Sequence, residues 1–211
     1  MKILEVKSLA IEDVKVIKFA RFTDHRGYFA EIFNANDIKN DPKLSFFKDV
    51  QFLQANESFS RKNTIRGLHF QWNPYMGKLV RTVRGRMIDL VLDIRKASKT
   101  FGKIIAYDIP SQPEDPCAEW IWVPVGFAHG NVFPEDSQIE YQCSGTWSPG
   151  CEAGISPFAP DIDWSLCDPA LKEVFDTAAR TALVTEKDKN GHTISSWLNN
   201  PDSRNFEIKK I

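Results

Sequence analysis

The sequence lacks an excess of either charge and also lacks long apolar runs. Its 27 lysine and arginine residues are balanced by 28 aspartate and glutamate residues, which leaves a net charge of −1. A nearly neutral chain has no electrostatic footprint for nucleic acid or for an anionic membrane, so an anionic ligand would need a local basic cluster. No run approaches the ~18 apolar residues of a transmembrane helix, and charges interrupt the first seven residues. We therefore expect neither a membrane span nor a signal peptide.

Cysteine is scarce as well. The chain has four cysteines without any C-x-x-C spacing, namely Cys117, Cys143, Cys151 and Cys167. Four cysteines without this spacing predict neither a zinc site nor a disulfide framework. We expect reduced, structural thiols in a cytoplasmic protein.

Several motifs that bind cofactors or activate nucleophiles are missing. The chain has no G-x-G-x-x-G, no P-loop and no G-x-S-x-G, so a nucleotide cofactor has no support. His69 and His129 stand among strand-like segments, as in some metal-binding β-barrels, but no His-x-His pair accompanies them. Because a firm metal site needs three or four protein ligands, we predict no metal and no cofactor.

The chain does contain a series of short segments rich in β-branched and aromatic residues, separated by turns. These predicted strands cover residues 14–20, a hairpin at 22–33 that turns at 24–27, and segments at 50–58, 77–83, 86–95, 103–109, 120–124 and 138–146. A hairpin turn at Arg84 and Gly85 is expected to join residues 77–83 to residues 86–95. Short strands at regular spacing predict an all-β fold, either an antiparallel sandwich or a jelly-roll barrel.

One helix is predicted near the C-terminus. Asp168 is placed to cap a helix over residues 169–179, with Pro169 at its first position. No linker or repeat divides the chain, and 211 residues are enough for one well-buried core. We therefore predict a single domain over residues 1–211, with a core at about 12–190 and a peripheral tail at 191–211.

Polar side chains share one face of the predicted strand at residues 50–58. Gln54 and Asn56 alternate with Leu53 and Ala55, so the two amides point the same way. A binding wall would give this pattern, and so would a face exposed to solvent. The sequence leaves both interpretations open.

The most informative stretch is the apolar segment at residues 63–71. Within it Gly67 allows close approach of another backbone, and Lys78 follows at short range. Arg66 and His69 would project from a mostly buried sheet, which costs free energy unless a polar group meets them. A lone histidine would be read as a satisfied core residue. Because a guanidinium and an ammonium lie nearby, a functional role for His69 is the stronger interpretation.

Several motifs of the chain resemble the dTDP-4-dehydrorhamnose 3,5-epimerase family, in the family's order. They are Phe22-x-Asp-x-Arg-Gly-x-Phe-x-Glu31, Gln54-x-Asn56, Ile65-Arg-Gly-Leu-His-Phe-Gln71, Lys78-Leu-Val-Arg81, Asp89-x-x-x-Asp-Ile-Arg95, Ser98-x-Thr-Phe-Gly102, Pro124-x-Gly-Phe-Ala-His-Gly130, and Tyr141 followed by Ser148-Pro149. The resemblance implies a cupin-type jelly roll, a homodimer, and a nucleotide-diphospho-4-keto-6-deoxy sugar as substrate.

The resemblance also implies catalytic roles. Such an epimerase removes a proton beside a ketone and returns one on the opposite face, which requires a base, an acid and a cation near the ketone oxygen. By match to the family, His69 is the base, Tyr141 the acid and Lys78 the cation. A carboxylate would hold the far ring nitrogen of the base. Asp188 matches the family's C-terminal Asp segment, and Asp89 is the rival.

A set of substrate-binding residues is implied in the same way. They are Phe22, Arg26, Glu31, Gln54, Asn56, Arg66, Asp89, His129, Trp147 and Glu152. Arg66, together with Arg26 from the partner subunit, would hold the diphosphate as forked donors.

The chain departs from the family pattern at two places. Thr146-Trp147 stands where the family usually has Tyr-Tyr, and Ser156-Pro-Phe-Ala-Pro160 replaces another usual stretch. These departures concern the nucleotide base and the sugar, so inversion at C3 alone or a different nucleotide, such as a GDP-linked sugar, stays open. A non-catalytic jelly roll that binds a nucleotide sugar is the competing class. It would have no reason to combine the predicted base, cation and acid.

Overall fold

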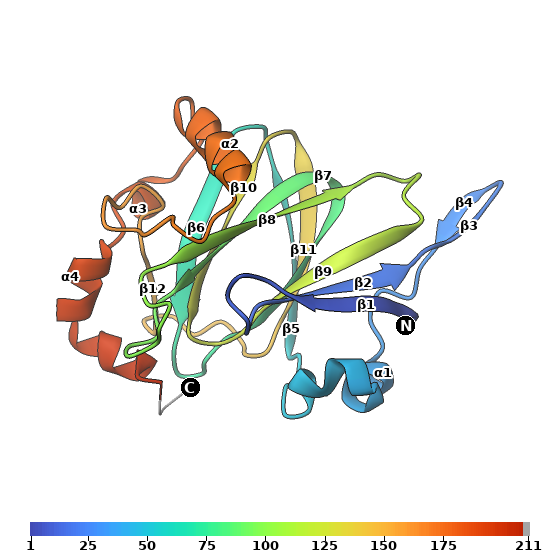
Figure 1. Ribbon diagram of the computed structural model, residues 1–211, viewed down its shortest axis with the longest axis horizontal. Coiled ribbons are helices and arrows are strands. Elements are labelled where there is room, and N and C mark those ends of the chain that lie inside the picture. The colour runs from blue at the N-terminus through green and yellow to red at the C-terminus, as the bar shows by residue number, and fades with distance from the viewer. Residues whose placement is uncertain (209–211) are drawn as a thin grey trace.

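Antiparallel strands form the body of the computed structural model, which describes residues 1–208 (Figure 1). The strands are β1 (Ile3–Ser8), β2 (Lys15–Ala20), β3 (Phe22–Asp24), β4 (Gly27–Phe29), β5 (Gln54–Ser60), β6 (Thr64–Gln71), β7 (Lys78–Asp93), β8 (Ile104–Ser111), β9 (Cys117–Val123), β10 (Phe127–Phe133), β11 (Ser137–Cys143) and β12 (Glu152–Gly154). The helices are α1 (Ala35–Asn40), η1 (Pro42–Phe47), α2 (Pro169–Ala179), α3 (Glu186–Lys189), α4 (Ile194–Asn199) and η2 (Pro201–Phe206). The predicted all-β, antiparallel class with a short C-terminal helical segment is confirmed.

The strand β7 belongs to two ladders. Its first part, residues 78–84, pairs with β11, and residues 78–80 also pair with β9. Its second part pairs with β8 at residues 85–92 and with β10 at residues 88–93. One ladder therefore runs β1-β2-β9-β7-β11-β5, and the other runs β8-β7-β10-β6-β12. Strands that pass from one sheet to the other in this way make the corners of sandwich folds.

The predicted hairpin at Arg84 and Gly85 is wrong, because the chain continues through this point as one strand. Gly85 has φ of +90° and pairs with Ser111, while Arg84 pairs with Gln138. A Cβ atom on Gly85 would lie 2.6 Å from the carbonyl oxygen of Asp136. Glycine in the left-handed region thus bends β7 from one ladder into the next. In sequence, such a bend has the same signature as a turn.

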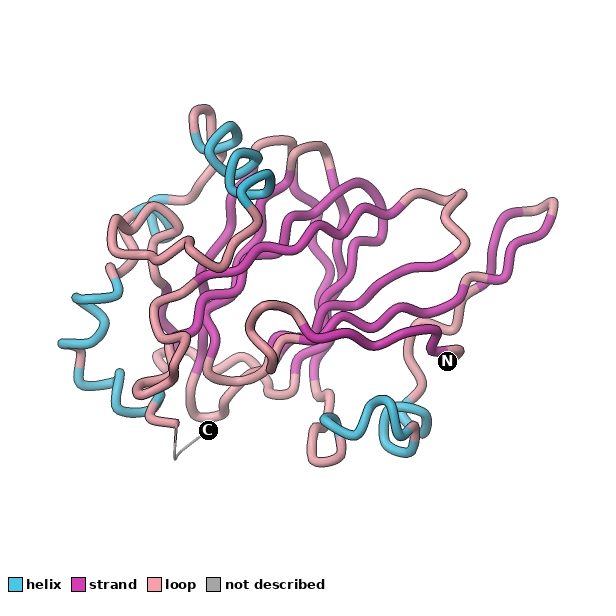
Figure 2. Tube along the Cα trace, viewed as in Figure 1, coloured by secondary structure: helices cyan, strands magenta, loops and turns pink. Residues whose placement is uncertain are grey.

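Apolar side chains form three layers. Val80 from one ladder and Val91 from the other lie in the layer between the two sheets. The outer face of the first ladder is covered by α1 and η1, where the ring of Phe47 packs 4.9 Å from that of Trp122. The outer face of the second ladder is covered by the C-terminal part of the chain (Figure 2). Both sheets are therefore covered on two sides over most of their length, but not at β5, where Phe59 is 60% exposed on the outer face.

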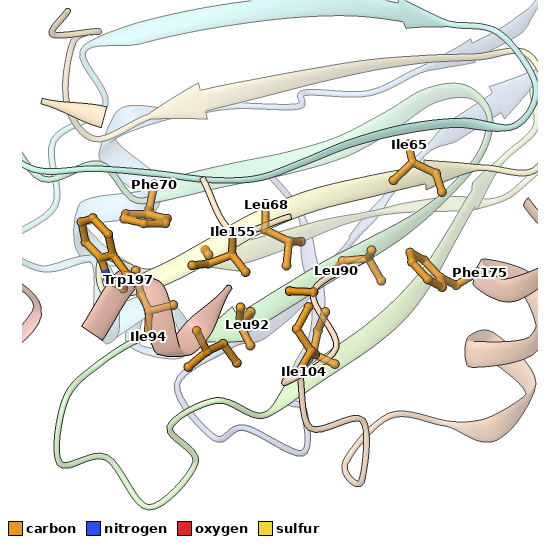
Figure 3. Packing of buried hydrophobic residues seen from close by; sticks show 14 of the residues in the cluster. Ile65, Leu68, Phe70, Leu90, Leu92, Ile94, Ile104, Ile155, Phe175 and Trp197 are labelled. Carbon is orange, nitrogen blue, oxygen red and sulfur yellow. The ribbon is translucent and has the colours of Figure 1, made fainter. Parts of the chain in front are cut away.

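The prediction of a peripheral tail is wrong for residues 191–208. Trp197 and Phe206 are each 1% exposed, and the Trp197 ring lies 4.8 Å from that of Phe70 (Figure 3). Most of this segment is polar, but a few large apolar side chains are enough to dock it. The N-terminal boundary also moves, since β1 joins the sheet from Ile3 onward. The rest of the predicted tail, residues 209–211, lies outside the described residues.

The helix predicted after residue 168 is present. Asp168 accepts a 2.8 Å hydrogen bond from the Ala170 N–H, and Pro169 occupies the first turn. The side-chain cap satisfies a donor that has no partner inside the helix. None of the described helices is long and apolar enough to cross a membrane.

A buried carboxylate fixes the loop after β7. Asp93 is fully buried and accepts hydrogen bonds from the Arg95 guanidinium and from the hydroxyls of Ser98 and Thr100. Burial alone would raise the pKa of Asp93, but these donors outweigh it and hold the pKa below its ordinary value of 3.8. The folded chain therefore binds this proton less readily than the unfolded chain. The resulting stability is present above the unfolded pKa and is lost as the pH falls through the folded pKa.

We predict that Asp93→Asn lowers the free energy of unfolding at pH 7 by about 2–3 kcal/mol, because Arg95, which is 14% exposed, keeps Asp13 but loses its buried charged partner. Denaturant unfolding at several pH values measures this, and the gap to the wild type should narrow below about pH 4. Asp108→Asn is the matched control. Asp108 pairs with Arg86 while about one third exposed, so its loss should cost at most about 1 kcal/mol. Equal costs for the two variants would contradict the prediction.

Candidate active site

A cavity of about 350 Å³ opens between the two ladders, and α3 forms part of its rim. It is lined by Ser58, Arg66, His69, Lys78, His129, Gly130, Asn131, Ile139, Tyr141, Thr185, Lys187 and Asp188. Six of these were predicted site residues: Arg66, His69, Lys78, His129, Tyr141 and Asp188. The fold therefore brings together side chains from β6, β7, β10, β11 and α3.

An irregularity in β6 places Arg66 and His69 on the same cavity. In a regular strand, residues three positions apart point to opposite faces. Here His129 pairs with His69 but Asn131 pairs with Arg66, so β6 has one residue more than β10 in this interval. Gly67, with φ of +103°, lies at the bulge, and a Cβ atom there would be 2.6 Å from the Cα atom of Gly130. The predicted close backbone approach at Gly67 is thus confirmed.

His69 and Asp188 form a hydrogen-bonded pair. The Nε2 atom of His69 lies 2.6 Å from Oδ1 of Asp188, whose other oxygen accepts the Gly67 N–H at 3.3 Å. Burial alone would raise the pKa of Asp188, but the hydrogen bonds from His69 and Gly67 outweigh it and lower the pKa. An ionised carboxylate only accepts hydrogen bonds, so it keeps a hydrogen on Nε2. In the neutral ring, Nδ1 is then free to accept a proton.

The rival carboxylate, Asp89, meets a different imidazole. Its Oδ2 atom lies 2.7 Å from Nε2 of His129 and accepts a 3.0 Å hydrogen bond from the Asn131 amide. Asp89 is fully buried, so it reaches the cavity only through these two side chains. The expectation that Asp89 itself touches a ligand therefore does not fit the structure. It supports residues that line the cavity.

Lys78 and Tyr141 lie on the wall opposite His69, on neighbouring strands. Tyr141 pairs with Val80 and Cys143 pairs with Lys78, so the lysine and the tyrosine are diagonal neighbours, about 7–8 Å apart along such a ladder. Burial lowers the pKa of Lys78, while nearby Cys143 and Asp89 partly oppose the shift. Burial raises the pKa of Tyr141. The wall thus carries a desolvated ammonium beside a phenol that keeps its proton.

The amide face of β5 is half-buried rather than exposed to solvent, although Gln54 and Asn56 do not themselves line the cavity. Gln54 donates to Asn56 at 3.1 Å and accepts the Trp147 N–H at 2.9 Å. The next residue on that face, Ser58, lines the cavity. A row of amides and a hydroxyl therefore leads from the rim into the site.

The rim beside this row is a chain of polar contacts. The indole N–H of Trp147 donates to Glu152 at 3.1 Å, and Glu152 pairs with the Lys187 ammonium at 3.0 Å. Trp147 is 59% exposed, so its ring is free to contact a ligand. Lys187 was missed from the sequence, although it stands next to Asp188. A charged residue in a polar tail gives no local sign that it will face a cavity.

Three predicted site residues lie away from the cavity of their own chain. Phe22 and Arg26 belong to the β3–β4 hairpin, which projects from the body of the protein (Figure 1). The Arg26 side chain is 79% exposed and pairs with Asp24. Glu31 contacts the N-terminal ammonium of Met1 and the Asn34 amide. Within one chain these residues cannot reach a ligand in the cavity.

Among residues 1–208, no group of three or more His, Cys, Asp or Glu side chains is placed to hold a metal ion. The two histidines of the cavity each point Nε2 at a carboxylate of their own.

Comparison with known proteins identifies close relatives. A family profile described as dTDP-4-dehydrorhamnose 3,5-epimerase matches residues 8–196. The chain is 35% identical to the enzyme of that name from Shigella flexneri, over 81% of this chain and 92% of the relative. It is 34% identical to the one from Methanothermobacter thermautotrophicus, over 86% and 89%. A solved structure of dTDP-6-deoxy-D-glucose-3,5-epimerase from Legionella pneumophila, in complex with dTDP-4-keto-L-rhamnose, superposes with a TM-score of 0.77 at 27% identity, over 96% and 97%.

We predict that Lys78 loses its proton below the ordinary lysine pKa of 10.5. Competitive acylation followed by mass spectrometry measures this, because only the neutral amine reacts. The labelling of Lys78 should rise at a lower pH than 10.5. In Asp89→Asn the rise should move to a still lower pH, because a carboxylate that favours the ammonium is gone. Asp108→Asn should leave it unchanged, and a shift to higher pH in Asp89→Asn would contradict the assignment.

Proposed function

The chain belongs to the dTDP-4-dehydrorhamnose 3,5-epimerase family, and from this membership we propose that it inverts C3 and C5 of dTDP-4-dehydro-6-deoxy-D-glucose, giving dTDP-4-dehydro-L-rhamnose. The observation that carries the proposal is the convergence of the His69–Asp188 pair, Lys78 and Tyr141 on one cavity. These are an oriented base, a cation and an acid. Inversion beside a ketone needs these three groups and no change of oxidation state.

His69 is the base in this mechanism. The C4 ketone acidifies the hydrogens on C3 and C5, and Nδ1 of His69 removes one of them while Asp188 holds Nε2. In a D-gluco ring, the C3 and C5 hydrogens lie on the same face. One base can therefore serve both carbons in turn, after a small shift of the ring. A second base is unnecessary.

Tyr141 returns the proton on the opposite face. His69 lies on β6 in one ladder, whereas Tyr141 lies on β11 in the other, so the two side chains approach a bound ring from different walls. Burial raises the pKa of Tyr141, which keeps the phenol protonated until the enolate needs it. Protonation from this side inverts the carbon.

Lys78 stabilises the enolate that links the two steps. Its ammonium lies in the cavity wall beside the acid, where the surrounding protein screens little of its charge. A preorganised cation at the developing O4 charge lowers the barrier to proton removal. Because burial lowers the pKa of Lys78 below its ordinary value of 10.5, this assistance is lost as the pH rises through that lowered pKa.

The nucleotide part of the substrate is held at the rim. Arg66 is exposed and is braced by Ser60 Oγ at 2.9 Å and by the Phe59 carbonyl, so its guanidinium is oriented for a diphosphate. Trp147 offers a flat apolar face for the base, near the amide row that starts at Gln54. Glu152, Asn56 and His129 complete the polar contacts.

A homodimer supplies the remaining contacts. The β3–β4 hairpin leaves Phe22 and Phe29 51% and 70% exposed, which is unfavourable unless a second copy covers them. Arg26 at its tip would then reach the diphosphate in the neighbour's cavity, beside Arg66. We further propose a cytoplasmic location, which agrees with the four free thiols of Cys117, Cys143, Cys151 and Cys167.

We predict that the two halves of the reaction separate on mutation. His69→Asn should abolish both solvent deuterium exchange and inversion at C3 and C5, with a loss of ~10²–10⁴-fold or more. Tyr141→Phe keeps the ring but removes the returned proton, so exchange should continue with retention while inverted product is lost. NMR of the sugar nucleotide in D₂O measures both deuterium exchange and inversion. Exchange in His69→Asn above a tenth of the wild-type rate would contradict the role of His69 as the base. Near-normal inversion in Tyr141→Phe would contradict the role of Tyr141 as the acid.

The dimer is tested by complementation. Arg26→Ala should lower kcat/KM by about 10–100-fold, the cost of one charge-assisted phosphate contact. When Arg26→Ala is co-expressed with inactive His69→Asn, mixed dimers contain one intact site, and activity should recover to about a quarter of wild type. Lys48→Ala with His69→Asn is the control for co-expression. Failure to recover activity would show that Arg26 serves its own chain, and normal kcat/KM in Arg26→Ala alone would show that it serves no site.

A further inference from the structure

The chain continues past α3 as a segment at residues 191–206, which we call the C-terminal strap. The family match ends at residue 196, yet Trp197 and Phe206 lie beyond it and are each 1% exposed. Side chains buried this deeply fix the strap to the rest of the protein. The contacts of the strap show which elements it connects.

The strap is attached at β12, the neighbour of the strand β6 that carries the base. The His192 N–H donates to the Gly154 carbonyl at 2.9 Å, and the Ser156 N–H donates to the His192 carbonyl at 2.9 Å. This forms a parallel bridge between His192 and Ile155. Gly154 in turn pairs with His69 across β12 and β6. The residues around β12 therefore connect the base to the start of the strap.

The same residues hold α3, which carries the carboxylate of the dyad. The Lys187 ammonium pairs with Glu152 at 3.0 Å, and the Ser156 hydroxyl donates to the Lys189 carbonyl at 2.9 Å. These two contacts flank Asp188 on its short helix. The position of the carboxylate thus depends on how firmly residues 152–156 and the strap are fixed.

A cavity of about 390 Å³ lies behind the dyad. His69 and Asp188 line it on one side, and Gly191, His192 and Ser196 of the strap line it on the other. A hollow supplies no packed atoms to press the carboxylate toward the imidazole. Hydrogen bonds supply that support instead: the Gly67 N–H binds the carboxylate directly, and the Gly191 N–H at the start of the strap donates to the Asp188 carbonyl at 3.3 Å.

Trp197 anchors the strap at this point. Its ring lies 4.8 Å from that of Phe70 (Figure 3). It also lies 5.6 Å from the His192 ring and 5.8 Å from that of Trp72. Phe70 follows His69 directly on β6. One indole therefore packs against the residue next to the base and against the residue that leads from α3 into the strap.

We propose that Trp197 is a positioning residue that, through the C-terminal strap, holds Asp188 against His69. The inference rests on the proposed function, because it assumes that the dyad is the catalytic base. It adds that geometry at the dyad is set from outside the family's matched span. Loosening the strap should misplace the carboxylate without disturbing the groups that bind the nucleotide.

The test is a double-mutant cycle on kcat. Trp197→Ala should lower kcat by about tenfold or more, as expected for a small misplacement of a catalytic group, with KM changed by no more than about twofold. In the Asp188→Asn background the same substitution should cost almost nothing, since the carboxylate it positions is gone. Trp197→Phe should restore most of the activity. Near-ultraviolet circular dichroism at the assay temperature confirms that each variant is folded.

A milder variant covers the case in which Trp197→Ala does not fold. Asp161 is exposed and accepts the Ile194 and Ser195 N–H groups at the start of α4, so Asp161→Ala loosens the strap without opening the core. It should lower kcat severalfold in the wild type and not in Asp188→Asn. Asp168→Ala removes a similar cap from α2 and should leave kcat unchanged.

The outcomes distinguish a wrong positioning role for Trp197 from a wrong catalytic role for the His69–Asp188 pair. If Asp188→Asn lowers kcat but the strap variants cost the same in both backgrounds, the positioning role is wrong and the proposed function stands. The same holds if the strap variants have normal kcat. If Asp188→Asn itself has normal kcat, the proposed dyad is wrong, and the strap inference falls with it.

Discussion

The continuity of β7 through Gly85 is the constraint on which the site depends. Because one strand serves both ladders, Lys78 lies in one wall and Asp89 in the other, and the cavity forms where the ladders face each other. The bend needs a positive φ and has no room for a side chain beside Asp136. A break at this point would uncouple the two walls. The bend at Gly85 therefore sets the placement of His69 and Tyr141 on opposite walls.

A second constraint is electrostatic. The cavity contains two imidazoles, and each is paired through Nε2 with its own carboxylate, Asp188 or Asp89. Both carboxylates are buried, which is costly unless donors compensate them. Each imidazole is one of those donors, beside the Gly67 N–H at Asp188 and the Asn131 amide at Asp89, so contacts that compensate the carboxylates also orient the rings. Only the pair at α3 is open to the rim, where short helices and the strap hold it in place.

The fold and most of the site could be predicted from local patterns. Strand alternation placed Gln54 and Asn56 on one face, and the Asp168 cap marked α2 correctly. Errors arose where a local signal has two meanings. Glycine after arginine signals a turn, but at Gly85 it serves a bend between sheets. A polar stretch signals a peripheral tail, but Trp197 is enough to bury it.

The sequence by itself determined the fold class and the family, and it predicted which residues serve as base, acid and cation, because these predictions follow from residue types in short, ordered motifs. Only the tertiary structure decided which carboxylate meets which imidazole. His69 and Asp188 are 119 residues apart, and the match of residues 185–188 to the family's segment was the one sequence signal that favoured Asp188 over Asp89. The choice follows from the register of β10 against β6 and β7 and from the path that brings α3 to the rim. These are properties of the whole chain's packing, which no single segment contains.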